Sequence, residues 1–212
     1  MRTFTFIALL LPIPLLAAEP KSLFDGKTLT GWEGDEKTWR VEDGAIVGGS
    51  LDAVVPRNQF LCTSKTYGDF ELKLKFKLLG DKDQANAGVQ FRTKRIPKHH
   101  EVIGYQADIG KGYWGALYDE SRRAKVLAGP KAEDAEKLIK ADDWNEYTIR
   151  AQGQWIQLWL NGTKTVNFIE KDAKIEATGI IGLQVHGGAK SKVLYKDITL
   201  EELPPLRETP KE

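Results

Sequence analysis

The stretch FELKLKFKL, from Phe70 to Leu78, sets the fold class of this chain. Phenylalanine and leucine occupy every second position, and the positions between them carry Glu71 and three lysines. A period of two is typical of a β-strand that buries one face and exposes the other to water. Such one-sided strands belong to antiparallel sheets, because parallel sheets are covered on both faces and show continuous apolar runs.

Further short strands are indicated on both sides of this stretch. The pairs Asp43-Gly44 and Asn161-Gly162 each adjoin short apolar runs, and both pairs favour tight hairpins. The other expected strands lie at 87–93, 104–110, 145–152, 155–160, 180–186 and 193–200. Only 131–140 (KAEDAEKLIK) is expected to be helical. The chain is therefore predicted to be all-β, an antiparallel sandwich or barrel with one short helical insertion.

The two ends of the chain differ from the body. Arg2 precedes an apolar run over 4–16, and Ala17-Ala18 precede Glu19, which is the order of a secretory signal peptide. The run is shorter than the ~20 residues of a spanning helix, so an uncleaved anchor is the weaker alternative. We expect a signal peptide at 1–18, one domain at 19–203 and a flexible tail at 204–212, in a secreted or periplasmic protein.

Charge and cysteine content exclude several classes of protein. Lysine and arginine number 31 against 30 aspartate and glutamate residues, so the chain without Arg2 is formally neutral. Nucleic-acid binders usually carry a basic excess, and no second apolar segment indicates a membrane span after signal cleavage. Cys62 is the only cysteine, so no internal disulfide can form, and we interpret it as a small buried hydrophobe.

Three expected strands each present two polar side chains at positions i and i+2, which share a face. A face that is merely solvated usually shows lysine, glutamate and threonine, as 71–77 does. Amide, guanidinium, carboxylate and imidazole groups instead hold hydroxyls and move protons. The three pairs are Gln90 with Arg92, Gln106 with Asp108, and Gln184 with His186. A structural alternative for Arg92 and Asp108 is that they form a salt bridge with each other and have no role in a site.

Aromatic residues add a second feature of a sugar-binding surface. The segment GYQADIGKGYWGALYDESRR (104–123) combines rings, glycines and polar groups, and pyranose C–H faces stack on rings. Tyr105 and Trp114 in this segment, and Trp159 on the strand WIQLWL, are candidates to stack on a sugar. The alternative for Tyr105 is a position in the hydrophobic core. The alternative for the Trp159 face is that it packs under another element.

A metal site is not predicted. His99, His100 and Glu101 are adjacent, but neighbours on an extended chain point to opposite faces, so a loop of surface histidines is the better interpretation. Asp108, Asp119 and Glu120 could bind a hard divalent cation such as calcium, although no loop motif for it is present.

A series of motifs, taken in order, resembles the 3-keto-disaccharide hydrolase domain family, whose fold is similar to the concanavalin A-like lectin and glucanase sandwich of jelly-roll type. The resemblance runs from Ser22 to Leu203. Its motifs are SLFDGKTLTGW (22–32), WRVEDGAIVG (39–48), YGDFELKLKFKL (67–78), NAGVQFR (86–92), GYQADIG (104–110), WNEYTIRAQG (144–153), LWLNG (158–162) and GIIGLQVHGG (179–188).

The resemblance implies a secreted or periplasmic hydrolase that cleaves 3-keto-glycosides or 3-keto-disaccharides. Many members carry Glu-x-Gln where this chain has Gln106-x-Asp108. A C3 ketone acidifies the C2 proton, so a modest base can start an elimination that water addition completes. We expect His186 or Asp108 to be that base, with Arg92, Gln90, Gln106 and Gln184 on the sugar oxygens and the enolate.

Two other functions compete with hydrolysis. The same sandwich hosts lectins, so a carbohydrate-binding module without chemistry is the first alternative. A protein interaction domain that uses the aromatic face is the second. No cofactor is predicted, and a sugar 3-dehydrogenase is the expected functional partner if the chain is an enzyme.

Overall fold

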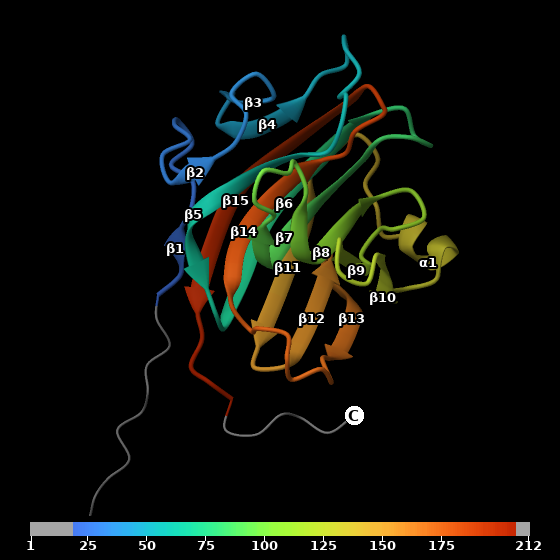
Figure 1. Ribbon diagram of the computed structural model, residues 1–212. Helices are drawn as coiled ribbons and strands as arrows, with labels where there is room; N and C mark the ends of the chain where they lie inside the picture. The colour runs from blue at the N-terminus through green and yellow to red at the C-terminus, as the bar shows by residue number, and fades with distance from the viewer. Residues whose placement is uncertain (1–18, 207–212) are drawn as a thin grey trace, which may run out of the picture.

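The computed structural model describes residues 19–206 as a β-sandwich (Figure 1), which confirms the predicted fold class. Every strand pair in it is antiparallel. The eight-stranded sheet runs in the order β13-β12-β11-β6-β15-β4-β3, with β1 paired to β15. The seven-stranded sheet runs in the order β10-β9-β8-β7-β14-β5-β2.

The eight-stranded sheet comprises β1 (Lys21–Ser22), β3 (Trp39–Glu42), β4 (Ala45–Gly49), β6 (Phe70–Gly80), β11 (Asn145–Gln152), β12 (Trp155–Leu160), β13 (Thr163–Ile169) and β15 (Ser191–Glu202). The seven-stranded sheet comprises β2 (Trp32–Glu33), β5 (Gln59–Tyr67), β7 (Asn86–Arg95), β8 (Val102–Gly110), β9 (Leu117–Glu120), β10 (Lys125–Ala128) and β14 (Gly179–Val185). The helix α1 (Ala132–Glu136) follows β10.

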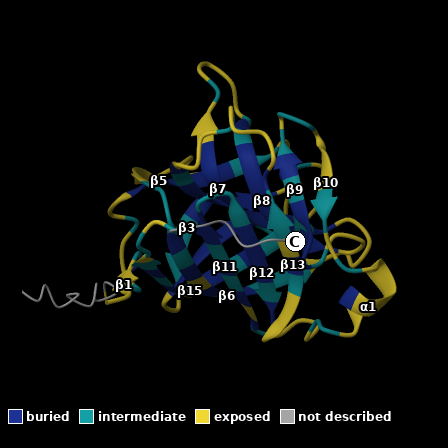
Figure 2. Ribbon diagram, turned by 90° about the horizontal axis from the view of Figure 1, so that it is seen from below, coloured by how far each residue is buried: buried dark blue, intermediate teal, exposed yellow. Residues whose placement is uncertain are grey.

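The core lies between the two sheets and is built by alternation. On β6 the side chains of Phe70, Leu72 and Phe76 are fully buried, and their lysine neighbours face outward. From the seven-stranded sheet, the side chains of Val89 and Phe91 on β7 pack into the same core and are also fully buried. Burial of such side chains contributes roughly 1.5–3 kcal/mol each. In Figure 2 the buried residues form the middle of the sandwich and the exposed ones gather in the loops.

Both predicted hairpins are present. Asp43 and Gly44 have φ of 48° and 74° between β3 and β4, and Asn161 and Gly162 have φ of 49° and 80° between β12 and β13. Two consecutive positive φ angles are the conformation that a tight two-residue hairpin requires, and these residue pairs adopt it at low cost.

The helical prediction was too long. The expected helix over 131–140 shortens to Ala132–Glu136, because the side chain of Lys131 cannot cap the first turn and only Ala135 of the helix is buried. A helix this short has little stability of its own unless its side chains pack against the rest of the protein. The short strands β9 and β10, which both precede α1, are not predicted from the sequence. β10 has no buried position to give it a period of two, and β9 is only four residues long.

The termini are described only in part. The predicted signal peptide 1–18 lies outside the described residues, as do 207–212 of the predicted tail. Residues 204–206 lie against the domain, where Gln152 donates a hydrogen bond from Nε2 to the carbonyl of Pro204 over 2.7 Å. Within residues 19–206, no helix is both long enough and apolar enough to cross a membrane.

Cys62 is fully buried, and this burial raises the pKa of its thiol to about 11.

Candidate functional site

A polar cleft of about 330 Å³ opens on the outer face of the seven-stranded sheet. Its floor comes from β8 and β9, and its rim comes from four connecting segments that lie far apart in sequence. The residues that line it are Asn58, Asp83, Gln84, Ala85, Asn86, Gln106, Asp108, Lys111, Tyr113, Tyr118, Glu120 and His186. We call this space the cleft.

Strand alternation places the floor residues. Tyr105, Ala107 and Ile109 of β8 face the core between the sheets, so Gln106 and Asp108 face outward into the cleft. This arrangement agrees with the predicted pairing of these two side chains on one face.

A chain of amide hydrogen bonds runs along this floor to Asp108. Gln90 lies opposite Gln106 in the β7–β8 register and donates from Nε2 to its Oε1 over 2.5 Å. Gln106 in turn donates from Nε2 to Oδ1 of Asp108 over 2.5 Å. The hydroxyl of Thr93 lies 3.2 Å from the remaining amide oxygen of Gln90. The chain fixes which way each amide points, because each nitrogen has an oxygen to meet.

Gly88 makes room for this chain. It lies opposite Asp108, and a β-carbon there would come within 2.4 Å of the side-chain carbonyl carbon of Gln106. Only a residue without a β-carbon therefore allows the Gln106 side chain to lie across β7.

Asp108 is the most perturbed carboxyl group of the cleft. Only 3% of the residue is exposed, and burial raises the pKa of its carboxyl to about 8, with a smaller contribution from the charge of Glu120 and an opposing one from the Gln106 hydrogen bond. A carboxyl group with such a pKa is mostly neutral at pH 7 and can donate a proton. Tyr147, in the opposite sheet, fixes the Asp108 backbone through a 3.1 Å bond to its carbonyl.

Two further titratable groups of the cleft share this desolvation. Burial also raises the pKa of Glu120, and the charge of Glu101 adds to it. Burial is again the first cause that raises the pKa of Tyr118, followed by the charge of Glu120. One side of the cleft therefore disfavours additional negative charge.

His186 lies at the rim, directly after β14. Its backbone N–H donates to the carbonyl of Asn86 over 3.0 Å, and its side chain is exposed. Nδ1 lies 2.7 Å from the carbonyl oxygen of Gly187, whose own N–H is held by Asn58 over 3.0 Å. A carbonyl oxygen can only accept a hydrogen bond, so Nδ1 carries the proton that is donated to it. In the neutral tautomer Nε2 then has the free lone pair.

Gln90 and Gln184 lie under the outer face rather than on the cleft surface. Both are fully buried, and Gln90 acts on the cleft only through Gln106. The amide nitrogen and oxygen of Gln184 have no hydrogen-bond partner within the described part of the chain. Neither side chain lines the cleft, so direct contact with a sugar, as expected for both, needs a movement that this structure does not show.

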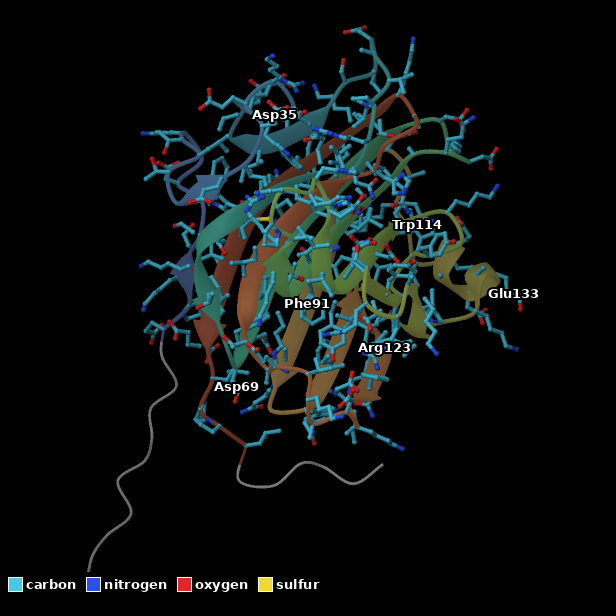
Figure 3. All side chains as sticks on the ribbon, in the orientation of Figure 1. Asp35, Asp69, Phe91, Trp114, Arg123 and Glu133 are labelled. Atoms are coloured by element: carbon cyan, nitrogen blue, oxygen red, sulfur yellow. The ribbon has the colours of Figure 1, made fainter. Side chains whose placement is uncertain are left out.

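The expectation that Arg92 shares the Gln90 face is wrong. Arg92 has a φ of 46°, at the point where the β7–β8 register shifts, and this irregularity turns its side chain away. The guanidinium instead donates to the carbonyls of Gly68 (3.2 Å) and Gly153 (2.6 Å) and to Asp69 (3.0 Å). It joins turns of the two sheets, and the suggested pair with Asp108 does not form. Asp69 lies at the lower end of the molecule in Figure 3.

The three aromatic candidates also lie outside the cleft. Tyr105 is in the core, stacked on Phe91 at 5.6 Å between ring centroids, and its hydroxyl donates to Glu170 over 2.6 Å, which corrects its expected stacking on a sugar. Trp159 lies on the outer face of the other sheet beneath Lys164, 5.0 Å from the ring centroid, so it cannot meet a ligand in the cleft. Trp114 lines a neighbouring cavity instead.

Sequence reasoning missed several lining residues. Tyr113 and Tyr118 supply the aromatic surface of the cleft, and Asn58 and Asn86 supply amides. The 104–123 segment signalled the two tyrosines by its composition, but no local pattern signals Asn58. Within the described residues, no three His, Cys, Asp or Glu side chains are grouped to hold a metal ion. His99 and His100 lie stacked on an exposed loop, as predicted.

The sequence matches the model of the 3-keto-alpha-glucoside-1,2-lyase-like domain over residues 19–201. Among curated proteins, none matches the chain.

Solved structures share the fold at low sequence identity. A "putative glycosyl hydrolase" from Parabacteroides distasonis ATCC 8503 superposes with a TM-score of 0.66 at 23% identity, covering 87% of this chain and 94% of its own. The carbohydrate-binding module CBM66 from Bacillus subtilis gives 0.63 at 17% identity, covering 81% and 96%. A Bacillus subtilis protein with a galectin-like fold gives 0.60 at 13% identity, covering 84% and 92%.

Proposed function

This chain belongs to the 3-keto-alpha-glucoside-1,2-lyase-like domain family, and we propose that it cleaves the glycosidic bond of 3-keto-glycosides by elimination followed by hydration. One observation carries the proposal: a buried carboxyl group with a pKa near neutrality, Asp108, and an exposed imidazole, His186, line the same polar cleft. A pair of acid and base in different environments is what proton-transfer chemistry requires.

The proposed first step is proton removal. Nε2 of His186 takes the proton from C2, and the electron pair of that C–H bond forms the C2–C3 enolate with its charge on the former ketone oxygen. The amide N–H groups and tyrosine hydroxyls of the cleft are the donors available to that oxygen. The enolate then re-forms the ketone, makes the C1–C2 double bond and breaks the bond from C1 to the aglycone oxygen.

Asp108 is the proposed acid in the second step. Its proton goes to the departing oxygen, which leaves as an alcohol, and Asp108 becomes a carboxylate. Water then adds to the double bond: its hydroxyl goes to C1, its other proton returns to Asp108, and the proton on His186 goes to C2. Both groups end in their starting states, and the net reaction is hydrolysis.

The test is turnover of a 3-keto glucoside and of its unoxidised counterpart by the purified protein, followed by aglycone release and by absorbance of the conjugated enone intermediate. We expect turnover of the keto compound alone, and its loss in His186→Ala and Asp108→Asn. Matched controls are His99→Ala and Asp197→Asn, which change an exposed histidine and an exposed carboxylate outside the cleft. Full activity in both cleft variants would reject the assigned acid and base.

Sugar binding without chemistry is the second candidate, favoured by the 44%-exposed Tyr113 at the cleft rim, an aromatic face that a pyranose can stack on. It predicts binding of unoxidised glycosides by calorimetry, weakened in Tyr113→Ala, with no product from any keto-glycoside.

The proposed location is outside the cytoplasm, secreted or periplasmic, on the strength of residues 1–18 alone. The proposed chemistry also requires that another enzyme, a sugar 3-dehydrogenase, first oxidises the C3 hydroxyl of the substrate.

A further inference from the structure

A second cavity of about 200 Å³ lies beside the cleft and shares Ala85 and Lys111 with it. Phe76 and Leu78, at the end of β6, supply its apolar floor, and Ile139 and Trp114 supply apolar walls. Charged and amide side chains stand around these apolar groups: Asp81, Lys82, Lys111, Glu136, Lys140, Asp142 and Asn145. We call it the apolar cavity.

Trp114 forms a fixed wall of the apolar cavity. Its indole is nearly parallel to the ring of Phe76, at 16° and 6.5 Å between centroids. Its Nε1 donates to Oε1 of Glu136 in α1 over 3.2 Å. Figure 3 shows Trp114 beside the helix that carries Glu133. An indole held by both a ring and a hydrogen bond presents its surface to a ligand at little entropic cost.

The size of the apolar cavity indicates that it works together with the cleft. Sites for small molecules usually measure roughly 300–1,000 Å³, so about 200 Å³ is too small for a separate ligand. The cleft, at about 330 Å³, is itself near the lower limit. Joined, the two spaces reach the size of an ordinary site for a substrate of two parts.

A surface ion pair stands at the junction. Lys111, which lines both spaces, binds Asp83, which lines only the cleft. Their side chains are 58% and 71% exposed, and exposed pairs of this kind contribute little to stability. A ligand passing from one space to the other can therefore displace this pair.

We infer that the apolar cavity binds the aglycone of the substrate, and that it selects aglycones that carry an apolar ring. The inference rests on the proposed function, in which the sugar occupies the polar cleft. The aglycone is attached at the reacting C1, so it must leave the cleft within a bond or two, and the adjoining space is apolar with an aromatic wall. A ring stacked on Trp114 gains both apolar burial and an aromatic contact.

The test compares kcat/KM for benzyl and methyl 3-keto-glucosides, whose leaving alcohols have nearly equal acidity. We expect the wild type to prefer the benzyl compound, and the benzyl-to-methyl ratio to fall about tenfold in Trp114→Ala, as loss of one stacked ring implies. Trp159→Ala is the matched control, since it removes an indole from the far sheet and should leave the ratio unchanged. An unchanged ratio in Trp114→Ala, or an equal fall in the control, overturns the inference.

A second variant covers the case in which Trp114→Ala fails to fold. Ala141 lines the apolar cavity at an exposed position. Ala141→Phe should fill the cavity without removing a core contact and should likewise lower the ratio. A ratio that stays at the wild-type value with the cavity filled also overturns the inference.

A protein that binds glycosides but does not cleave them would give a result that can be told apart from failure of the aglycone site. If the wild type turns over neither compound, calorimetry with unoxidised benzyl and methyl glucosides replaces kinetics. Tighter binding of the benzyl glucoside, lost in Trp114→Ala, supports the aglycone site even though catalysis is absent. Equal affinity for both glucosides overturns it.

Discussion

Gln106 donates a hydrogen bond from Nε2 to Oδ1 of Asp108 over 2.5 Å, and this bond defines how the buried carboxyl group can act. Because Gln90 occupies the amide oxygen of Gln106, the amide cannot turn round to accept a proton from Asp108. Oδ1 must therefore accept, and the acid proton belongs on Oδ2. The sheet thus supplies a neutral carboxyl group with a defined proton position.

The first prediction concerns the pH dependence of the rate. Burial raises the pKa of Asp108 to about 8, and only the neutral form can donate a proton, so kcat/KM for a 3-keto glucoside should fall as pH rises through about 8. Asp108→Asn should be about 10²–10⁴-fold slower and lack this alkaline limb. The measurement is a pH–rate profile of both proteins.

Glu120→Gln is the control for this profile. The charge of Glu120 contributes to the raised pKa of Asp108, so its removal should move the alkaline limb to lower pH. A wild-type rate that rises through pH 8 would instead make Asp108 the base.

The second prediction concerns stability, and its sign follows from the same shift. The folded-state pKa of Asp108 is raised above the ordinary value, so the stability that it contributes is fully present below about pH 4 and is lost as pH rises through about 8. Urea unfolding should show wild type losing more than about 1.4 kcal/mol relative to Asp108→Asn between pH 4 and 9, the equivalent of one pKa unit. Parallel losses in the two proteins would contradict the raised pKa.

Alternation in the sequence predicts most of the sandwich and the floor of the cleft, because a strand with one buried face fixes which side chains share the other. Gln106 and Asp108 lie together for this reason. The same alternation predicts the wrong face for Arg92, because no sequence pattern indicates a positive φ at this residue, which is not glycine. Alternation also cannot say which sheet carries an outward face, so it does not reveal that Trp159 lies on the sheet opposite the cleft.

The rim of the cleft lies beyond what a single sequence can predict. Asn58, Tyr113 and His186 stand on segments separated by dozens of residues, and their proximity depends on strand order. The order β8-β7-β14-β5 places those segments side by side, and no local pattern specifies that order.

The third prediction tests the amide chain through Gly88. In Gly88→Ala the new β-carbon would lie 2.4 Å from the side-chain carbonyl carbon of Gln106, so that side chain must leave Asp108. We expect kcat/KM to fall by about tenfold or more, because misplacement of a supporting group is costly, and the alkaline limb to move to higher pH as the lowering effect of Gln106 is lost.

Gly68→Ala is the matched control for Gly88→Ala. Gly68 lies between β5 and β6, and the nearest atom to a new β-carbon there is 3.9 Å away, an ordinary contact. Its rate and pH profile should match the wild type. A Gly88→Ala protein with an unaltered pH profile would show that Gln106 does not govern the Asp108 pKa.

The last prediction separates structure from catalysis at Arg92. Its side chain is 2% exposed and binds the half-buried Asp69 and two backbone carbonyls. Arg92→Met removes the cation beside this carboxylate, which keeps its hydrogen bond from the Gly153 N–H, and takes the guanidinium donor from both carbonyls. We expect a loss of about 1.5–3 kcal/mol in the free energy of unfolding, measured by urea denaturation, with kcat/KM unchanged at temperatures where the variant is folded. Lys75→Met, which breaks an exposed pair with Asp197, should leave the free energy of unfolding almost unchanged. An Arg92→Lys protein of wild-type stability but reduced kcat/KM would return Arg92 to the sugar site, because only a contact with substrate would then account for the loss.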